Sequence, residues 1–99
     1  MKKIIAKLRE TMTLLVYNED TSQTTGNMYS EIVNIRGSAR LLGVDEDFKE
    51  IFEVIILKPP AKFQNVAFTA LKWNGQYYRY NSKLREYKGD FLKCSIVKL

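Results

Sequence analysis

The sequence VAFTALKWNGQYYRYN, residues 66–81, decides the fold of this chain. At its centre the dipeptide Asn74-Gly75 lies between two runs rich in β-branched and aromatic residues. A type I′ turn needs positive φ at both central positions, and Asn-Gly tolerates this best. The stretch therefore predicts a β-hairpin with a two-residue turn. An isolated hairpin is only marginally stable in water, so the rest of the chain must supply strands beside it.

Strand-like segments recur along the whole chain. They are 11–17, 28–35, 50–57, 66–73, 76–81 and 91–99. Polar residues at 18–27 predict a long exposed loop, and the basic segment 82–89 predicts a connecting turn. The pattern predicts a mainly β chain that forms a small six-stranded antiparallel β-barrel or sandwich. A barrel is preferred because closure removes the exposed edges of so short a sheet.

The segment 37–50 gives conflicting signals. Gly37 interrupts the preceding strand, and Asp45 is suited to cap a helix that has further acidic residues in its first turn. From Phe48 onward apolar residues recur at helical spacing, but 51–57 is rich in β-branched residues, which favour strands. We expect a loop with a short helical turn up to about Lys49, followed by a strand to Leu57.

The composition is that of one globular domain over residues 1–99, with 45% hydrophobic and 27% charged residues. The single cysteine excludes an intramolecular disulfide and, with no histidine, leaves almost no ligands for zinc. No apolar run reaches the roughly 18–20 residues of a membrane helix, and the basic opening is too short for a signal peptide. We therefore expect a soluble protein made in a cytoplasm, with no membrane partner.

Charge divides the chain into three parts. The basic residues of 1–9, an expected N-terminal arm, are Lys2, Lys3, Lys7 and Arg9. Residues 10–53 carry nine carboxylates against three basic residues, whereas 54–99 carry nine basic residues against two carboxylates. This division fits either an ordinary solvated surface or a subunit that is self-complementary or that faces an anion with only part of its surface. Residues 2–9 could form a helical turn or a disordered arm, and they could be either an ordinary solvated terminus or an arm that contacts a partner.

Catalysis is poorly supported by the residue types present. Histidine is absent, and the acidic residues of 45–50 lack the alternating spacing of a calcium loop. Cys94 alternates with apolar neighbours, as a buried small hydrophobe does. We expect no enzymatic activity, no metal site and no cofactor.

A single-stranded nucleic-acid-binding barrel is an alternative. The residues of the central hairpin that could form a stacking platform are Trp73, Tyr77, Tyr78, Arg79 and Tyr80. The basic C-terminal half would then contact phosphates. In alternating strands, however, half of these aromatic residues must face inward as ordinary core.

The order of elements resembles that of the head–tail joining proteins of tailed bacteriophages, also called head-closure, stopper or head-completion proteins. The matching features are Leu8-Arg9 before an alternating strand, the break at Arg36-Gly37-Ser38, the excursion and strand over 37–57, the aromatic hairpin at Trp73-Asn74-Gly75, and a last strand containing Cys94. The resemblance covers nearly all of the chain.

This resemblance implies a virion protein that does no chemistry. Its copies form a ring, twelvefold like the portal, which joins the portal or an adaptor to the tail or tail-terminator protein. The ring continues the channel for packaged DNA without sequence specificity, and in some relatives the 37–50 loop helps to close it. Assembly takes place in the host cytoplasm, and the final location is the head–tail interface of the virion.

The resemblance also suggests which residues make contacts. The channel-facing residues of the 37–50 loop would be Gly37, Arg40, Asp45, Glu46, Asp47 and Glu50. The residues that contact the portal, the adaptor or a neighbouring copy would be Lys2, Lys3, Lys7, Arg9, Lys83, Arg85 and Lys88. Carboxylates in the channel would repel DNA phosphates, and an acidic region could meet basic residues of the next copy.

Overall fold

The computed structural model describes residues 8–17 and 28–99, and within them it contains six strands and one short 3-10 helix. The strands are β1 (Glu10–Tyr17), β2 (Tyr29–Val44), β3 (Glu50–Leu57), β4 (Ala70–Trp73), β5 (Gln76–Tyr87) and β6 (Phe91–Lys98), and the helix η1 is Ala61–Phe63. The expected polar loop at 18–27 lies outside the described residues. So does most of the expected N-terminal arm, including Lys2, Lys3 and Lys7.

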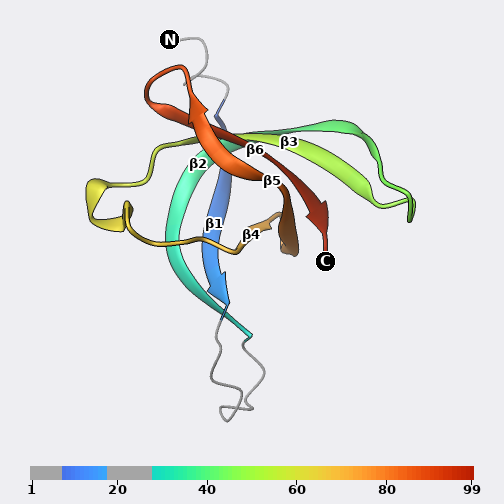
Figure 1. Cartoon of the computed structure of the whole chain (residues 1–99), viewed down its shortest axis with the longest axis horizontal. Helices are drawn as coiled ribbons and strands as arrows, with labels where there is room; N and C mark the ends of the chain where they lie inside the picture. The colour runs from blue at the N-terminus through green and yellow to red at the C-terminus, as the bar shows by residue number, and fades with distance from the viewer. Residues whose placement is uncertain (1–7, 18–27) are drawn as a thin grey trace.

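The six strands form a closed antiparallel barrel in the order β1-β2-β3-β6-β5-β4, as the sequence predicts (Figure 1). The barrel closes where β4 pairs with β1, from Met12 opposite Trp73 to Leu15 opposite Ala70. Every neighbouring pair is antiparallel, and closure gives each strand a neighbour on both sides within the barrel, whereas residues 38–44 of β2 pair with β3 alone.

The β4–β5 hairpin has the predicted two-residue turn. Asn74 and Gly75 both have positive φ, 53° and 74°, and Trp73 pairs directly with Gln76. This is the backbone that a type I′ turn requires, and it matches the twist of the flanking strands.

The expected connecting turn over 82–89 is wrong, because β5 continues to Tyr87 and only the Lys88–Gly89 turn remains. Charged residues at 83 and 85 flank the half-buried Leu84, so this polar segment keeps the alternation of a strand. Register shifts between Tyr80 and Arg85 accommodate the irregular pairing with β6.

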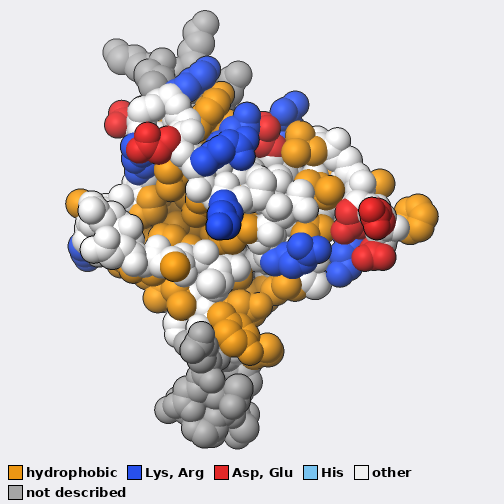
Figure 2. Space-filling view, viewed as in Figure 1, with side chains coloured by type: hydrophobic (Ala, Val, Ile, Leu, Met, Phe, Trp, Pro, Cys, Tyr) orange, Lys and Arg blue, Asp and Glu red, His pale blue; other side chains and the backbone are white. Residues whose placement is uncertain are grey.

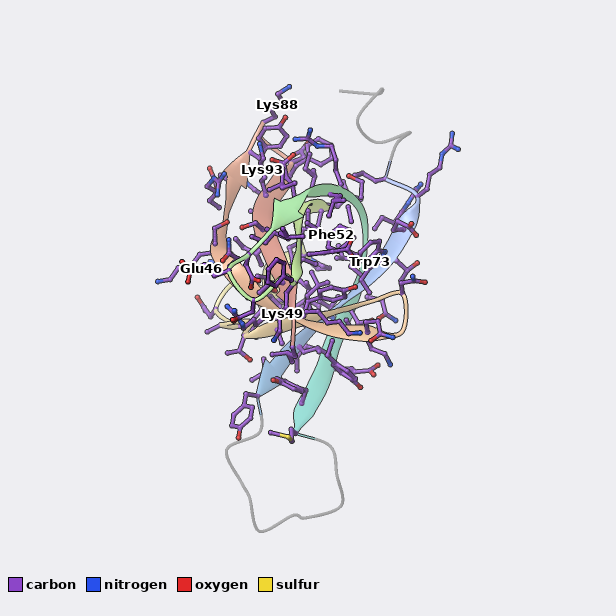
Figure 3. All side chains as sticks on the ribbon, turned by 90° about the vertical axis from the view of Figure 1, so that its right-hand side faces the viewer. Glu46, Lys49, Phe52, Trp73, Lys88 and Lys93 are labelled. Atoms are coloured by element: carbon purple, nitrogen blue, oxygen red, sulfur yellow. The ribbon has the colours of Figure 1, made fainter. Side chains whose placement is uncertain are left out.

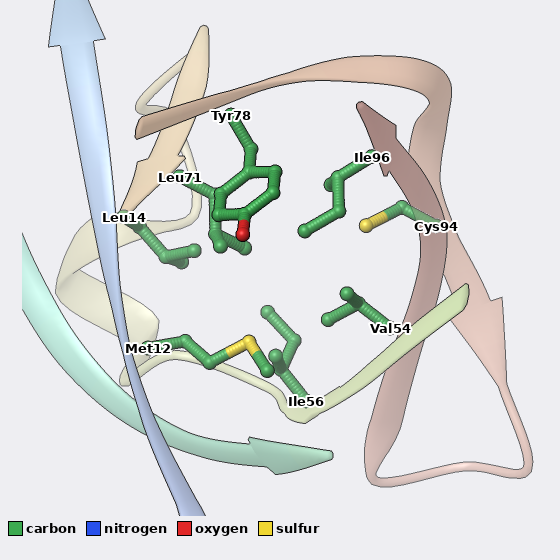
Figure 4. Close-up of a cluster of buried hydrophobic side chains, with 8 residues drawn as sticks. All are labelled: Met12, Leu14, Val54, Ile56, Leu71, Tyr78, Cys94 and Ile96. Carbon is green, nitrogen blue, oxygen red and sulfur yellow. The ribbon is translucent and has the colours of Figure 1, made fainter. Parts of the chain in front are cut away.

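Side chains from five strands fill the barrel (Figure 4). The buried cluster comprises Met12, Leu14, Val54, Ile56, Leu71, Tyr78, Cys94 and Ile96. From β2, the partly buried Val33, Ile35 and Ala39 pack against it. The predicted inward face of the last strand, which includes Cys94 and Ile96, is confirmed.

The expected loop and helical turn over 37–50 are also wrong. β2 does not break at Gly37 but continues to Val44, and it pairs with β3 as far as Val44 opposite Glu50. Gly37 is buried, and its missing side chain lets the two strands pack closely, so this glycine does not end the strand. The β-branched content of β3 prevails over the helical spacing. The segment therefore projects from the barrel as a β-hairpin, at the right of Figure 1.

Candidate functional site

The end of the β2–β3 hairpin, residues 41–50, is both apolar and acidic, and we call it the tip. Its apolar residues that are more than half exposed are Leu41, Leu42, Val44 and Phe48. Its carboxylates are Asp45, Glu46, Asp47 and Glu50, against the single basic residue Lys49. Exposed apolar residues that cluster in this way and are flanked by charge are typical of a surface that another molecule covers.

Asp45 holds the turn at the tip. Its Oδ1 accepts hydrogen bonds from the backbone N–H of Asp47 at 2.9 Å and of Lys49 at 2.8 Å. The backbone N–H of Phe48 also donates to the Asp45 carbonyl oxygen at 3.0 Å. The aspartate thus caps a tight turn, as aspartate commonly does, and not the expected helix.

Phe48 occupies the least expected position in this turn. Its φ is +62°, in the left-handed region that costs a non-glycine residue about 1–2 kcal/mol. It is nevertheless 87% exposed, so no packing within the described chain compensates for this conformation. The ring lies at the rim of a shallow hollow of about 270 Å³ that reaches Phe52 and Tyr78.

A second surface lies beside η1, and we call it the basic groove. It has a volume of about 770 Å³, and its lining residues are Lys58, Pro59, Ala61, Phe63, Gln64, Val66, Ala67, Phe68, Tyr80, Lys83, Leu84, Glu86 and Leu92. The apolar members form most of the lining, and the lysines lie among them. Sites with this balance bind apolar groups and use the few charges for orientation.

The charged residues of the groove are only partly engaged. Lys58 Nζ lies 3.0 Å from Glu86 Oε1 in an exposed ion pair. Lys83 is exposed and makes no ion pair within the described residues, and Lys62 lies nearby on η1 with its Nζ 5.1 Å from the centre of the Phe63 ring. This surface therefore carries more lysine side chains than carboxylates.

The tip and the basic groove lie on opposite sides of the barrel (Figures 1 and 2). The acidic tip is at the right of Figure 2, whereas η1 and the hydrophobic side chains beside it are at the left. In Figure 3, which is turned so that the tip faces the viewer, Glu46 and Lys49 lie on the turn, and Lys88 and Lys93 lie near the upper end of the molecule. The two surfaces therefore cannot meet within one copy.

The predicted channel-facing residues divide into three groups. Asp45, Glu46, Asp47 and Glu50 come together at the tip. Gly37 is buried within β2 in the barrel wall and does not lie on a loop. Arg40 lies on the hairpin nearer the barrel, where it forms an ion pair.

That ion pair belongs to a small network on β2, β3 and β6. Glu53 accepts a hydrogen bond from Arg40 Nη2 at 3.0 Å, and Lys93 Nζ lies 3.2 Å from its other carboxylate oxygen. The hydrogen bond from Arg40 is the main cause that lowers the pKa of the Glu53 carboxyl, with partial burial opposing it and Lys93 adding to it. The network joins the base of the hairpin to β6.

The basic residues predicted to contact a partner are more scattered. Lys83 and Arg85 are exposed on β5, and Lys88 lies in the following turn with its Nζ 5.3 Å from the centre of the Tyr87 ring. Arg9 is exposed just before β1. Of these residues, only Lys83 lines the basic groove.

The aromatic residues of the central hairpin mostly face the core. Trp73 contacts Phe52, with ring centres 5.1 Å apart, and Tyr78, at 5.7 Å. Tyr80 is partly buried against the core, and burial raises its pKa well above the usual range. Tyr77 remains exposed, but its ring stacks on Tyr29 at 5.9 Å. Little of the proposed stacking platform is therefore free for nucleic-acid bases.

Cys94 is buried in the core, and that burial raises its pKa to about 12. Among the described residues, no group of three metal-ligating side chains comes together, and no helix is long and apolar enough to cross a membrane. Comparisons with protein-family models, with curated proteins and with solved structures find no match for this chain.

The basic groove and the exposed position of Phe48 were not predicted from the sequence. A signal for the groove is present in the link from Pro59 to Phe68, where apolar residues follow two prolines without the alternation of a strand. For Phe48, the signal is a large aromatic residue within a run of acidic turn residues, where a core position is hard to reach.

Proposed function

We propose that this chain is a structural, non-enzymatic subunit of the head–tail connector of a tailed bacteriophage. Copies form a ring, twelvefold like the portal, between the portal or adaptor and the tail, and the ring continues the channel for packaged DNA. The protein assembles in the host cytoplasm and ends at the head–tail interface of the virion. The support is the order of elements on which the resemblance rests, together with a closed barrel that carries a projecting excursion between β2 and β3.

The observation that carries the proposal is the tip itself. A chain of 99 residues exposes four large apolar residues at the end of one hairpin, which is unfavourable for a protein that works alone in water. A subunit of an assembly covers such residues in its final state. The closed barrel supplies a rigid base from which the hairpin can reach a neighbouring molecule.

The charge division supports assembly between copies. In a closed ring each copy presents one face to a different face of its neighbour, so an acidic face can meet a basic one. Such contacts weaken as salt rises, because the screening length falls to about 8 Å at physiological ionic strength and to about 3 Å at 1 M. We therefore expect the assembly to depend on ionic strength.

The resemblance directs the tip toward the channel, where its carboxylates would repel phosphates. Free in a water-filled channel, however, the tip would leave Leu41, Leu42 and Phe48 exposed. A contact with a neighbouring protein accounts for the apolar and the acidic residues together. We therefore favour that position for the tip over one in the channel.

The test is deletion of the coding sequence from the phage or prophage that carries it. We expect electron micrographs to show DNA-filled or leaking heads separated from free tails, and a plasmid copy of the gene should restore joined particles. Normal tailed particles after deletion would refute the proposal. So would a gene that lies far from any genes for portal, terminase and capsid proteins.

The alternative, a single-stranded nucleic-acid-binding barrel, is tested by filter binding of the purified chain to single-stranded DNA. Because Trp73, Tyr78 and Tyr80 face the core, we expect only weak binding that disappears as salt rises. Tight binding that persists at physiological salt would favour the alternative.

A further inference from the structure

We infer that the tip of one copy inserts into the basic groove of the next copy, with Phe48 as the anchoring side chain. This inference rests on the proposed ring and specifies the contact that builds it. Four features of the described residues support it: the conformation of Phe48, the lining of the groove, the charges of the two surfaces and their relative placement.

Phe48 is placed for a contact that the isolated chain does not make. Asn or Gly suits a position with φ of +62° better, so the turn gives no reason for phenylalanine. The two hydrogen bonds to Asp45 Oδ1 nevertheless fix the backbone on both sides of it. A large, rigid aromatic ring held outward on a fixed turn is typical of the residues that contribute most to protein interfaces.

The basic groove has the size and lining to receive this ring. Its volume of about 770 Å³ accommodates an aromatic side chain together with an aliphatic side chain of the tip. The lining includes Phe63, Val66 and Leu84, which are apolar and half-buried. Transfer of the exposed phenylalanine from water into this lining is favourable in proportion to the apolar area that is covered.

The charges of the two surfaces are complementary. Glu46 and Asp47 directly precede Phe48 at the tip and Lys49 follows it, whereas Lys58 and Lys83 line the groove. Lys83 has no ion-pair partner within the described residues, and the exposed Glu86 that pairs with Lys58 is weakly held. A carboxylate of the incoming tip can pair with Lys83 without breaking an existing ion pair, and it can compete with Glu86 for Lys58.

The placement of the two surfaces gives a contact that repeats. Since they lie on opposite sides of one copy, each copy can offer its tip to one neighbour and its groove to the other (Figures 1 and 2). This is a heterologous contact, which closes into a ring when the rotation per copy allows it. In a closed ring every tip and every groove is occupied.

The first experiment removes the anchor without disturbing the turn. Phe48→Asn suits the positive φ, so the variant should fold at least as stably as the parent. We expect it to weaken the contact about 30-fold or more and to leave at least tenfold less chain in particles when it complements the deletion. Met28→Asn, which alters an exposed apolar residue outside both surfaces, is the matched control and should assemble normally.

The second experiment tests which residues meet. A chain with both Lys49→Cys, on the tip, and Gln64→Cys, in the groove lining, keeps the residues argued to hold the contact; it is incorporated into particles and treated with a short bismaleimide. We expect a ladder of linked copies, because the tip of one chain would lie near the groove of the next. The native Cys94 is buried and should not react. The control pair, Lys49→Cys with Gln76→Cys, should give no ladder, because Gln76 lies at the start of β5 outside the groove.

The outcomes separate this inference from the proposed function. A ladder from the pair that includes Gln64→Cys but not from the control pair, together with loss of Phe48→Asn from particles, supports the inference. Particles that contain the double-cysteine chain but give no ladder overturn it and leave the connector proposal standing, as does normal assembly of Phe48→Asn. Absence of the parent chain from joined particles overturns the proposed function, and the inference with it.

Discussion

Gly37 of β2 lies so close to Ile56 of β3 that a Cβ built on the glycine would stand 2.8 Å from Ile56 Cγ2. The same Cβ would stand 2.8 Å from the carbonyl oxygen of Ile55. Real Cβ atoms do not approach other atoms so closely, so the strands must separate if a side chain is added here. This glycine therefore permits the close pairing that continues from the barrel into the projecting hairpin.

Gly37→Ala should lower the free energy of unfolding by about 1–3 kcal/mol, because it overpacks a site bounded by backbone and a β-branched side chain. The control is Gly43→Ala, where nothing lies within 4 Å of the added Cβ and φ is not positive. This control should be neutral or stabilising by up to about 1 kcal/mol. Denaturation by guanidinium measures both changes, and equal stability of the two variants would contradict the close packing at Gly37.

The indole N–H of Trp73 is buried and has no hydrogen-bond acceptor among the described residues. Trp73→Phe removes this donor and keeps an aromatic ring against Phe52 and Tyr78. Loss of ring volume is then offset by loss of an unsatisfied group that costs about 1–3 kcal/mol. We expect a net change of no more than about 1 kcal/mol.

Trp73→Ala is the contrasting variant, and it should cost about 3–5 kcal/mol because it leaves a cavity beside the core. Chemical denaturation measures the free energy of unfolding of both variants, and we expect their m values to equal that of the parent. If Trp73→Phe proves as destabilising as Trp73→Ala, the N–H does have a partner in solution.

The carboxyl of Glu53 should make stability depend on pH. Chiefly through Arg40, its folded pKa lies below the ordinary value of 4.5. A lowered folded pKa means that the stabilisation is fully present above 4.5 and is lost as pH falls through the folded value. Glu53→Gln should therefore lower stability at pH 7, and the difference from the parent should shrink below pH 4.5.

We expect the Glu53→Gln effect to be about 1 kcal/mol or less, since the side chain of Arg40 is 72% exposed. Thermal melts at several pH values measure it. Glu86→Gln is the matched control, because its partner Lys58 is also exposed and the pair should contribute nothing measurable. A difference for Glu53→Gln that stays constant down to pH 3 would refute the ion-pair explanation.

Cys94 should be chemically inert in the folded protein. Burial raises its pKa to about 12, so almost no thiolate is present at pH 8, and the side chain is closed off from solvent. Labelling with a thiol reagent should follow global unfolding as guanidinium is added, whereas an introduced Lys88→Cys should react at once. Rapid labelling of Cys94 in native buffer would show that β6 opens locally.

The sequence was sufficient to predict the barrel because its strongest signals are local. Asn74-Gly75 specifies a hairpin by turn chemistry alone, and alternating apolar residues such as Cys94 and Ile96 fix which face of a strand is buried. Local signals also caused the two wrong predictions, the loop over 37–50 and the connecting turn over 82–89. Gly37 reads as a break because glycine usually ends a strand, and its close approach to Ile56 depends on a partner far along the chain.

The candidate surfaces were predictable to different extents. The acidic residues of 45–50 were correctly grouped, because neighbours in a short turn stay neighbours in the fold. The basic groove was not predicted, because it forms only when the link after β3 packs against β5 and β6. Residues such as Phe63 and Leu84 are far apart in sequence, and no local pattern indicates that they share a surface.

The projecting hairpin is made of the same two strands that wall the barrel, and β3 passes from the tip directly into pairing with β6. Apart from the register shift between Leu41 and Gly43, the strand pairing is continuous from the tip to the barrel, so a push on the end of the hairpin would be transmitted to the whole body. In a ring linked through such hairpins, one barrel cannot tilt without tilting its neighbours. The central channel of such a ring would then widen or narrow through one concerted movement of all its copies.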